Sequence, residues 1–277
     1  MLSKRILTAI IGVAVAAFVI QYGQWLFTMT VAGLSLTAWY EYCAMLQVKK
    51  FSILRNLGFC AILLLFGCAW LGNSQETVLV IVAVTVFALL HTVISAKGIS
   101  IVDAGLTIFG LIYIGLLFTY LVLLRFSDLS LQLPNTLNFL SPGTAFLWVA
   151  LIGTWSSDTF AYFIGTQFGK HKLCPTISPQ KTVEGAIGGI AGCILIITFL
   201  GIWMQLSTIH SLFLGVLIAI IAPVGDLVES ALKRFAGVKD SGRVLPGHGG
   251  ILDRFDSILF TVPAVYYYVQ IILLYQY

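Results

Sequence analysis

Long apolar stretches, rather than short alternating ones, set the pattern of this 277-residue chain. Each stretch approaches or reaches the roughly 20 residues with which a helix crosses a bilayer. Backbone groups in lipid must pair within helices or a closed barrel, and barrel strands would alternate apolar and polar residues, whereas these stretches are apolar on all sides. The pattern therefore predicts an all-α, polytopic integral membrane protein with about nine transmembrane helices. The predicted spans are residues 6–20, 25–46, 57–71, 77–95, 104–124, 144–168, 185–204, 211–232 and 255–275.

The composition agrees with lipid as the main solvent. Hydrophobic residues make up 59% of the chain and charged residues 9%, with a mean hydropathy of +1.01. A soluble domain is usually about a quarter charged. So few charges cannot cover a globular surface, which excludes a soluble protein.

The placement of the cations predicts an orientation. With nine spans, fourteen of the fifteen Lys and Arg residues fall on the side of the N-terminus, and only Arg125 falls on the other. Because cytoplasmic loops accumulate Lys and Arg, we expect a cytoplasmic N-terminus in a multi-pass protein of the cell (inner) membrane. The first span follows Lys4 and Arg5 and is also similar to a signal peptide, but cleavage near Ala16 would leave a very short apolar core. We therefore expect this segment to be the first span.

Ionisable residues divide the chain into two regions. Residues 1–143 form an N-terminal transmembrane region that shows span architecture only, and Glu41, His91 and Asp103 lie near span ends. Such residues usually cap helices or reach the interface, and we expect that role for these three. Residues 144–277 form a C-terminal transmembrane region that carries the candidate chemistry, and the polar cluster there faces the cytoplasmic side.

The first two pieces of that cluster precede and open the seventh span. Asp158 lies inside an apolar span, where a carboxylate is costly and normally faces a partner or an aqueous cavity; the alternative is a carboxylate that only bonds neighbouring hydroxyl groups. Ser178 and Thr182 can cap the next helix or bind phosphate at its N-terminus. Lys181 would add a positive charge for a phosphate.

The third piece pairs carboxylates on two predicted helices. Asp226, Glu229 and Lys233 are spaced to share one helix face, and Asp253 and Asp256 are spaced i and i+3 at the start of the last span. Hard oxygen ligands of this kind suit Mg²⁺, which usually binds one or two carboxylates together with substrate phosphates. A mere positively charged loop would need no such acids, so the mixture of acids and bases indicates handling of a metal and a polyphosphate.

The third piece also resembles the signature of a known family, the phosphatidate cytidylyltransferases. The matching residues, at the family's spacing, are Ser230, Lys233, Arg234, Lys239, Asp240, Pro246, Gly247, His248, Gly249, Gly250, Asp253, Arg254 and Asp256. The segments 158–165 and 178–185 are similar to two further motifs of the family in the same order. Gln180 stands where relatives often carry Lys or Asn, a position that we regard as variable.

The resemblance implies the conversion of CTP and phosphatidate to CDP-diacylglycerol and pyrophosphate, a step of phospholipid biosynthesis. It implies a requirement for Mg²⁺ with Asp226 and Asp253 among the ligands, a possible second, monovalent cation such as K⁺, and a homodimer. No nucleic-acid partner is expected. The expected catalytic residues are Asp226, Asp253, Lys239, His248 and Asp256. The expected substrate-binding residues are Asp158, Ser178, Lys181, Thr182, Glu229, Lys233, Arg234, Asp240, Gly249, Gly250 and Arg254.

Two other functions remain open from the sequence. A transporter could use intramembrane acids as an ion pathway, although transporters tend to show inverted repeats with sites near the midplane, and these acids cluster toward one face. A CTP-dependent lipid or polyprenol kinase would share the nucleotide chemistry but transfer the γ-phosphate. The position of the label that enters the lipid from labelled CTP would separate these activities.

Overall fold

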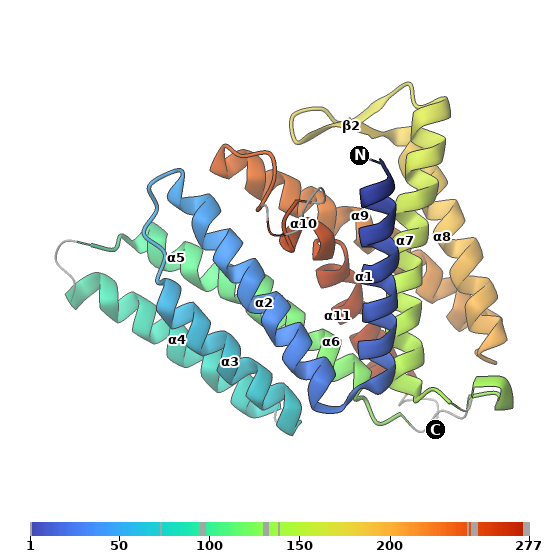
Figure 1. Cartoon of the computed structure of the whole chain (residues 1–277), viewed down its shortest axis with the longest axis horizontal. Helices are drawn as coiled ribbons and strands as arrows, with labels where there is room; N and C mark the ends of the chain where they lie inside the picture. The colour runs from blue at the N-terminus through green and yellow to red at the C-terminus, as the bar shows by residue number, and fades with distance from the viewer. Residues whose placement is uncertain are drawn as a thin grey trace. The chain divides into compact units, whose positions relative to one another are not determined.

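The fold is built from helices, as the computed structural model of the chain shows (Figure 1). The structure describes residues 2–72, 74–94, 98–129, 133–137, 139–242, 244 and 249–273. These residues divide into two compact units. Unit 1 comprises Met1–Leu123 and Phe235–Arg254, and unit 2 comprises Leu124–Arg234 and Phe255–Tyr277.

Unit 1 is a helical bundle whose core lies between α2, α3 and the α5–η1 helix. Trp39 and Tyr42 are fully buried on α2 and stack on each other. The Trp39 indole donates a hydrogen bond to the carbonyl oxygen of Arg55 (3.0 Å), and the Tyr42 hydroxyl donates one to that of Leu106 (2.7 Å). The core is therefore closed by aromatic side chains that also satisfy backbone groups. Its helices are α1 (Leu2–Tyr22), α2 (Gln24–Gln47), α3 (Arg55–Leu71), α4 (Ser74–Ile94), α5 (Ile101–Gly110), the π-helix η1 (Leu111–Leu116) and α6 (Leu117–Arg125), which ends in unit 2.

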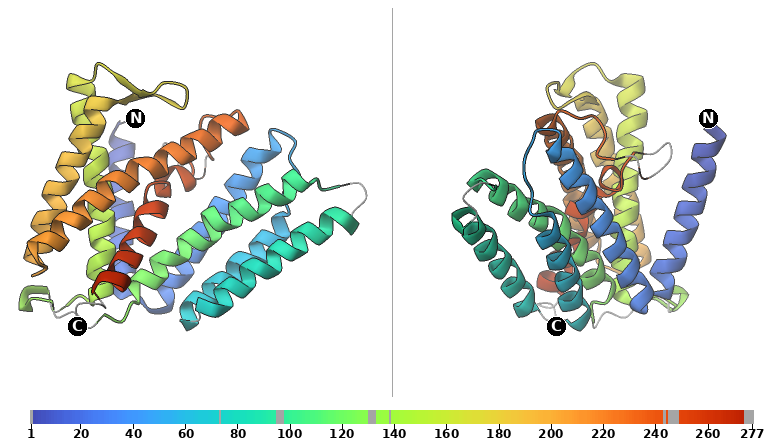
Figure 2. Two further views of the ribbon diagram at one scale, coloured as in Figure 1. Left: turned by 180° about the vertical axis from the view of Figure 1, so that it is seen from behind. Right: turned by 60° about the vertical axis from the view of Figure 1, so that its left-hand side comes forward.

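Unit 2 is built around two long helices that lie side by side, α7 (Pro142–Phe168) and α8 (Val183–Trp203), as both views of Figure 2 show. The face of α8 that meets α7 consists of glycines, so the two backbones approach closely. A Cβ on Gly189 would lie 2.8 Å from the carbonyl oxygen of Ser157. Small residues at such spacing are typical of tightly packed membrane helices. The glycines of this face are Gly185, Gly188, Gly189 and Gly192.

The other elements of unit 2 pack around this pair. Helix α9 (Thr208–Ala236), whose last two residues belong to unit 1, contacts α8 where Cys193 approaches the carbonyl oxygen of Gly215. Helix α11 (Ile258–Tyr268) packs on α7 through a buried hydrogen bond between Thr154 and Thr261 (2.9 Å). The 3-10 helix η2 (Asn135–Leu137) and the π-helix η3 (Val269–Leu273) complete the unit.

The predicted helical character is confirmed: within the described ranges, helices lie along each of the nine predicted spans, with a break in the ninth at residues 256 and 257. Four helical segments there are long and apolar enough to cross a membrane, at Gln75–Ile94, Ile101–Arg125, Val183–Trp203 and Thr208–Ala236. Shorter apolar helices occur at Gly12–Tyr22, Arg55–Leu71 and Ile258–Ile271. The end of the ninth predicted span, residues 274 and 275, lies outside the described residues. The chain is thus an all-α, membrane-type protein.

One local element was not predicted, and one expectation was wrong. Residues between α7 and α8 form an antiparallel hairpin, β1 (Lys172–Cys174) and β2 (Ser178–Thr182), with Lys172 opposite Thr182. The last predicted span is interrupted, because α10 (Leu252–Phe255) ends one residue before Asp256 and α11 begins at Ile258. Asp253 and Asp256 therefore do not occupy one continuous helix.

Candidate functional site

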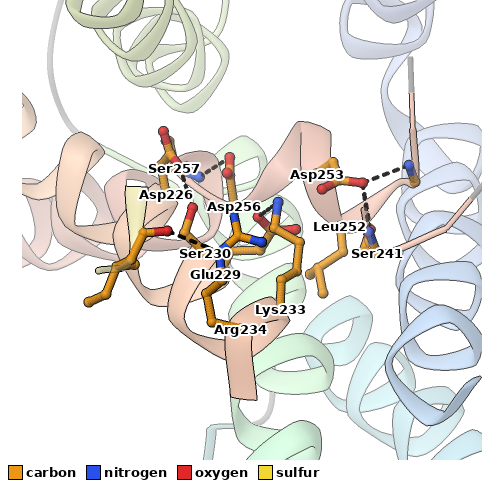
Figure 3. Close-up of polar contacts among 12 residues, drawn as sticks. Asp226, Glu229, Ser230, Lys233, Arg234, Ser241, Leu252, Asp253, Asp256 and Ser257 are labelled. Atoms are coloured by element: carbon orange, nitrogen blue, oxygen red, sulfur yellow. Dashed lines mark hydrogen bonds and ion pairs between the residues drawn. The ribbon is translucent and has the colours of Figure 1, made fainter. Parts of the chain in front are cut away.

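A carboxylate on the long apolar helix α9 forms the centre of the polar region in unit 2. Asp226 lies ten residues before the end of α9 at Ala236, about 15 Å along the helix axis. Lys181 of β2 reaches it, with Nζ 2.6 Å from Asp226 Oδ2. Ser230, one turn further along α9, donates a longer hydrogen bond to Asp226 Oδ1 (3.3 Å; Figure 3). A charge this far from the helix end is thereby neutralised by a residue that comes from outside the helices.

Two further carboxylates lie within electrostatic range of Asp226. Asp158, ten residues before the end of α7, is accessible on the surface of the chain and interacts with both Asp226 and Lys181. Asp256, half-buried in the turn before α11, interacts with Asp226, Asp158 and Lys233. Three acids, two on helices α7 and α9 and one in the turn before α11, thus interact electrostatically with one another and with two lysines, an arrangement that favours a bound cation.

An ion pair lies one turn beyond Asp226 on α9. Lys233 forms a salt bridge with Glu229, as their i, i+4 spacing predicts, and the Glu229 side chain is fully buried. The Lys233 side chain is only 13% exposed. The predicted pairing of Glu229 and Lys233 on one helix face is therefore confirmed.

The β-hairpin is fixed at both of its ends to the helices of unit 2. Arg234 Nε donates a hydrogen bond to the carbonyl oxygen of Ile177 at the hairpin turn (3.2 Å). Glu184, in the first turn of α8, accepts hydrogen bonds from the backbone amides of Lys170 and His171 and lies 2.6 Å from His171 Nδ1. These contacts hold β2 so that Lys181 reaches Asp226.

Thr182 caps α8, as predicted, because its side chain accepts a hydrogen bond from the Gly185 amide (3.1 Å). Ser178 does not cap the helix. It is the first residue of β2, opposite Cys174, and is half-buried there.

The signature residues that belong to unit 1 form a separate polar cluster. Asp253 Oδ2 accepts three hydrogen bonds, from the Ser241 amide (3.0 Å), the Ser241 hydroxyl (2.9 Å) and the Gly250 amide (2.9 Å; Figure 3). Gly249 has φ +86°, which favours glycine, and a Cβ there would lie 2.8 Å from the same oxygen. The predicted glycines thus let the backbone fold closely around Asp253.

Glu41 is the residue that the sequence interpretation misjudged. It is 2% exposed, and its two carboxyl oxygens accept hydrogen bonds from the amides of Ile251 (3.0 Å) and Leu252 (3.1 Å) and from the Ser241 hydroxyl (3.4 Å). The available signal was its position six residues inside the end of α2, too deep for a simple interfacial group. Asp103, in contrast, caps α5 with Ser100, as expected.

Three further predicted site residues lie on the surface of unit 1, where the described contacts do not assign them a role. Lys239, Asp240 and Arg254 are exposed in unit 1. His248 lies outside the described residues, so its predicted catalytic role stays a prediction.

Unit 2 offers carboxylate ligands for a metal ion, although too few for a complete coordination shell. Within the described ranges, no group of three or more Asp, Glu, His or Cys side chains lies close enough together to hold an ion by itself. Mg²⁺ usually takes one or two carboxylates and completes its shell with water and substrate phosphates. Asp226 with Asp158 or Asp256 fits that requirement, and Lys181 already provides a positive charge at the Asp226 carboxylate.

The fold and these contacts define a polytopic helical membrane protein with a carboxylate- and lysine-rich polar region inside its helices. The sequence profile of the Cytidylyltransferase family matches residues 3–272, and the chain belongs to that family. It is 35% identical to a phosphatidate cytidylyltransferase of Bacillus subtilis over 96% of this chain and 97% of the relative. It is also 35% identical to a protein of that name from Synechocystis, over 98% and 97% of the two chains. The resemblance noted in the sequence is therefore confirmed.

Proposed function

We propose that this protein is a CTP:phosphatidate cytidylyltransferase, a nucleotidyltransferase that converts CTP and phosphatidate to CDP-diacylglycerol and pyrophosphate. An oxygen of the phosphatidate phosphate attacks the α-phosphorus of CTP. The new oxygen–phosphorus bond forms as the bond from the α-phosphorus to the bridging oxygen of the β-phosphate breaks, and pyrophosphate leaves. The full-length similarity to relatives that carry this name supports the proposal.

The observation that carries the proposal is the contact between Lys181 of the β-hairpin and Asp226 of the apolar helix α9. A cation and a carboxylate in this position suit a reaction in which a polyphosphate and a metal are handled at the level of a lipid headgroup. The acyl chains of the lipid substrate can then stay in hydrocarbon during the reaction.

The residues of unit 2 have distinct tasks in this proposal. Lys181, Lys233 and Arg234 bind phosphate oxygens, and Arg234 is suited to a bidentate contact. Phosphoryl-transfer reactions gain most of their rate from positioning and charge neutralisation, which these cations provide. The salt bridge with Glu229 holds Lys233 in place until a phosphate binds.

Mg²⁺, when bound at Asp226 together with Asp158 or Asp256, would neutralise charge on the phosphates. The prediction that Asp253 is also a ligand rests on the resemblance, as do the possible K⁺ ion and the homodimer. His248 and Lys239 keep their predicted catalytic roles, and Ser178, Thr182, Asp240, Gly249, Gly250 and Arg254 keep their predicted roles in substrate binding.

We also propose nine membrane crossings, with the N-terminus and the site on the cytoplasmic face of the inner membrane. The distribution of Lys and Arg supports this orientation. CTP would then reach the site from the cytoplasm.

Purified protein in lipid nanodiscs that contain phosphatidate, supplied with CTP and Mg²⁺, tests the activity. The label of [α-³²P]CTP should enter the lipid, and that of [γ-³²P]CTP should not. Entry of the γ label would identify a kinase, and the absence of both labels from the lipid would contradict the proposed enzyme.

A further inference from the structure

We infer that Glu41 is a positioning residue for the proposed reaction: it holds Ser241 and residues 250–252 so that the Asp253 carboxylate has one fixed orientation. The inference rests on the proposed function where it concerns catalysis. Its structural part concerns contacts within unit 1 alone and stands on its own. Glu41 belongs to none of the motifs that resemble the family signature.

The contacts of Glu41 connect two distant parts of the chain. Its carboxyl oxygens accept hydrogen bonds from the amides of Ile251 and Leu252, 210 and 211 residues away in the sequence. These amides lie at the beginning of α10, whose first turn contains Asp253. Glu41 therefore satisfies backbone donors at the start of the helix that carries Asp253, although it comes from α2.

A single hydroxyl group joins the two acids. Ser241 Oγ lies 2.9 Å from Asp253 Oδ2 and 3.4 Å from Glu41 Oε2. The Ser241 and Gly250 amides also donate to Asp253. Asp253 binds the Gly250 amide, Glu41 binds the next two amides, and both acids contact the Ser241 hydroxyl, so a shift of one carboxyl group must disturb the hydrogen bonds of the other.

The glycines of this segment fit Glu41 closely. A Cβ on Gly242 or Gly250 would overlap the carboxyl group of Glu41. The backbone at these two glycines therefore fits closely around this side chain, which is 2% exposed. A group that only capped a helix at an interface would not require such a fit.

The matched pair of variants is Glu41→Gln and Asp103→Asn. Glu41→Gln keeps the size of the side chain but replaces one acceptor oxygen by a donor, so one backbone amide of α10 loses its acceptor. Asp103 is also a buried acid of unit 1 that accepts backbone hydrogen bonds, but from Ser52 and Ser100. Asp103→Asn therefore perturbs the unit to a similar degree without removing a hydrogen bond to Ser241 or to residues 250–253.

Hydrogen exchange tests the structural part. In peptides that cover residues 249–255, Glu41→Gln should speed amide exchange by at least about tenfold, as expected for a lost hydrogen bond to a charged group. Asp103→Asn should leave these peptides unchanged. Unchanged exchange in Glu41→Gln would overturn the inference, whatever the activity of the protein.

Kinetics test the catalytic part. Glu41→Gln should raise the Mg²⁺ concentration for half-maximal activity or lower kcat by about 10- to 100-fold, the usual effect of losing a group that orients a metal ligand. The KM for phosphatidate should stay close to the wild-type value. Normal kinetics with accelerated exchange would overturn the positioning role, whereas an inactive wild-type protein with accelerated exchange in the variant would contradict only the proposed function.

Ser241→Ala provides a second route if Glu41→Gln does not fold. It removes the shared hydroxyl without leaving a new donor in the buried site. The same pattern with a smaller amplitude is expected, and wild-type exchange and wild-type Mg²⁺ dependence together would contradict the inference.

Discussion

Lys181 Nζ lies 2.6 Å from Asp226 Oδ2, so a residue of the β-hairpin is paired with a carboxylate in the interior of α9. In the proposed reaction the carboxylate binds a metal ion and the lysine binds a phosphate. When the substrates bind in this proposal, the salt bridge is replaced by a carboxylate–metal contact and a lysine–phosphate contact. Until then, each of the two charges neutralises the other.

The first prediction concerns the proposed metal ligands. Asp226→Asn and Asp253→Asn should each lower cytidylyl transfer by at least about 10³-fold, the scale of losing a major electrostatic element. Both variants should stay inserted and monodisperse in size-exclusion chromatography. Asp128→Asn, which changes an exposed acid of unit 2, should be as active as the wild type. Near-normal turnover of either variant at ordinary Mg²⁺ would show that the ligands are assigned wrongly.

Removal of the metal should abolish the activity reversibly. We expect EDTA to stop the transfer of α label from CTP to lipid, because the phosphate charges would no longer be neutralised, and excess Mg²⁺ to restore it. Circular dichroism should show the same helix content with and without EDTA. Full activity after dialysis against EDTA would contradict a metal requirement.

The third prediction separates the two substrates. Lys181→Ala should mainly raise the KM for CTP, because Lys181 comes from the hairpin outside the helices. Arg234→Ala should mainly raise the KM for phosphatidate, measured as a surface fraction, because Arg234 lies at the end of α9. A change in KM with normal kcat reports lost uniform binding, and a fall in both kcat and kcat/KM reports a transition-state contact.

Each variant is titrated against each substrate. Should both variants weaken CTP binding alone, the basic residues would form one triphosphate site. Arg234→Ala also removes the hydrogen bond to Ile177 at the hairpin turn. If loosening of the hairpin were its only effect, the KM values for both substrates should rise.

Stability should depend on the glycine face between α7 and α8. Gly189→Ala should lower the free energy of unfolding by about 1–3 kcal/mol, because a Cβ would lie 2.8 Å from a backbone oxygen that cannot move freely. Gly33→Ala is the control, since no atom lies within 4 Å of its added Cβ. It should be neutral or stabilising, as expected for Gly to Ala in a helix. Thermal unfolding in one detergent compares the two variants, and equal stability would contradict the packing argument.

The fifth prediction concerns membrane topology. Reporter fusions after Lys50 and Lys172 should report the cytoplasm, and a fusion near Asn135 should report the outer side. The reason is the one-sided distribution of Lys and Arg. A periplasmic signal from the Lys172 fusion would contradict both the nine crossings and a cytoplasmic site.

The helices could be predicted because their signal is local. A long apolar stretch leaves the backbone no alternative to a helix in lipid, and the face shared by Glu229 and Lys233 follows from helix geometry alone. The Thr182 cap is likewise a local relationship, three residues long.

The missed features depend on contacts that no local pattern contains. The hairpin strands are short and polar, and they include Pro179, so neither β-propensity nor alternation marks them. Glu41 was misjudged because its partners lie about 210 residues away. The break at Asp256 was missed because the apolar pattern alone cannot show where a helix stops and restarts.

The sequence distance between Glu41 and its partners has a consequence for biogenesis. At about 5–20 residues per second, a ribosome needs roughly 10–40 s to make the residues between Glu41 and Ile251. During that interval α2 carries a carboxyl group whose final hydrogen-bond donors do not yet exist. The nascent protein must therefore keep this group hydrated, protonated or temporarily bound by other donors, and unit 1 can reach its final form only after the ribosome has passed Arg254.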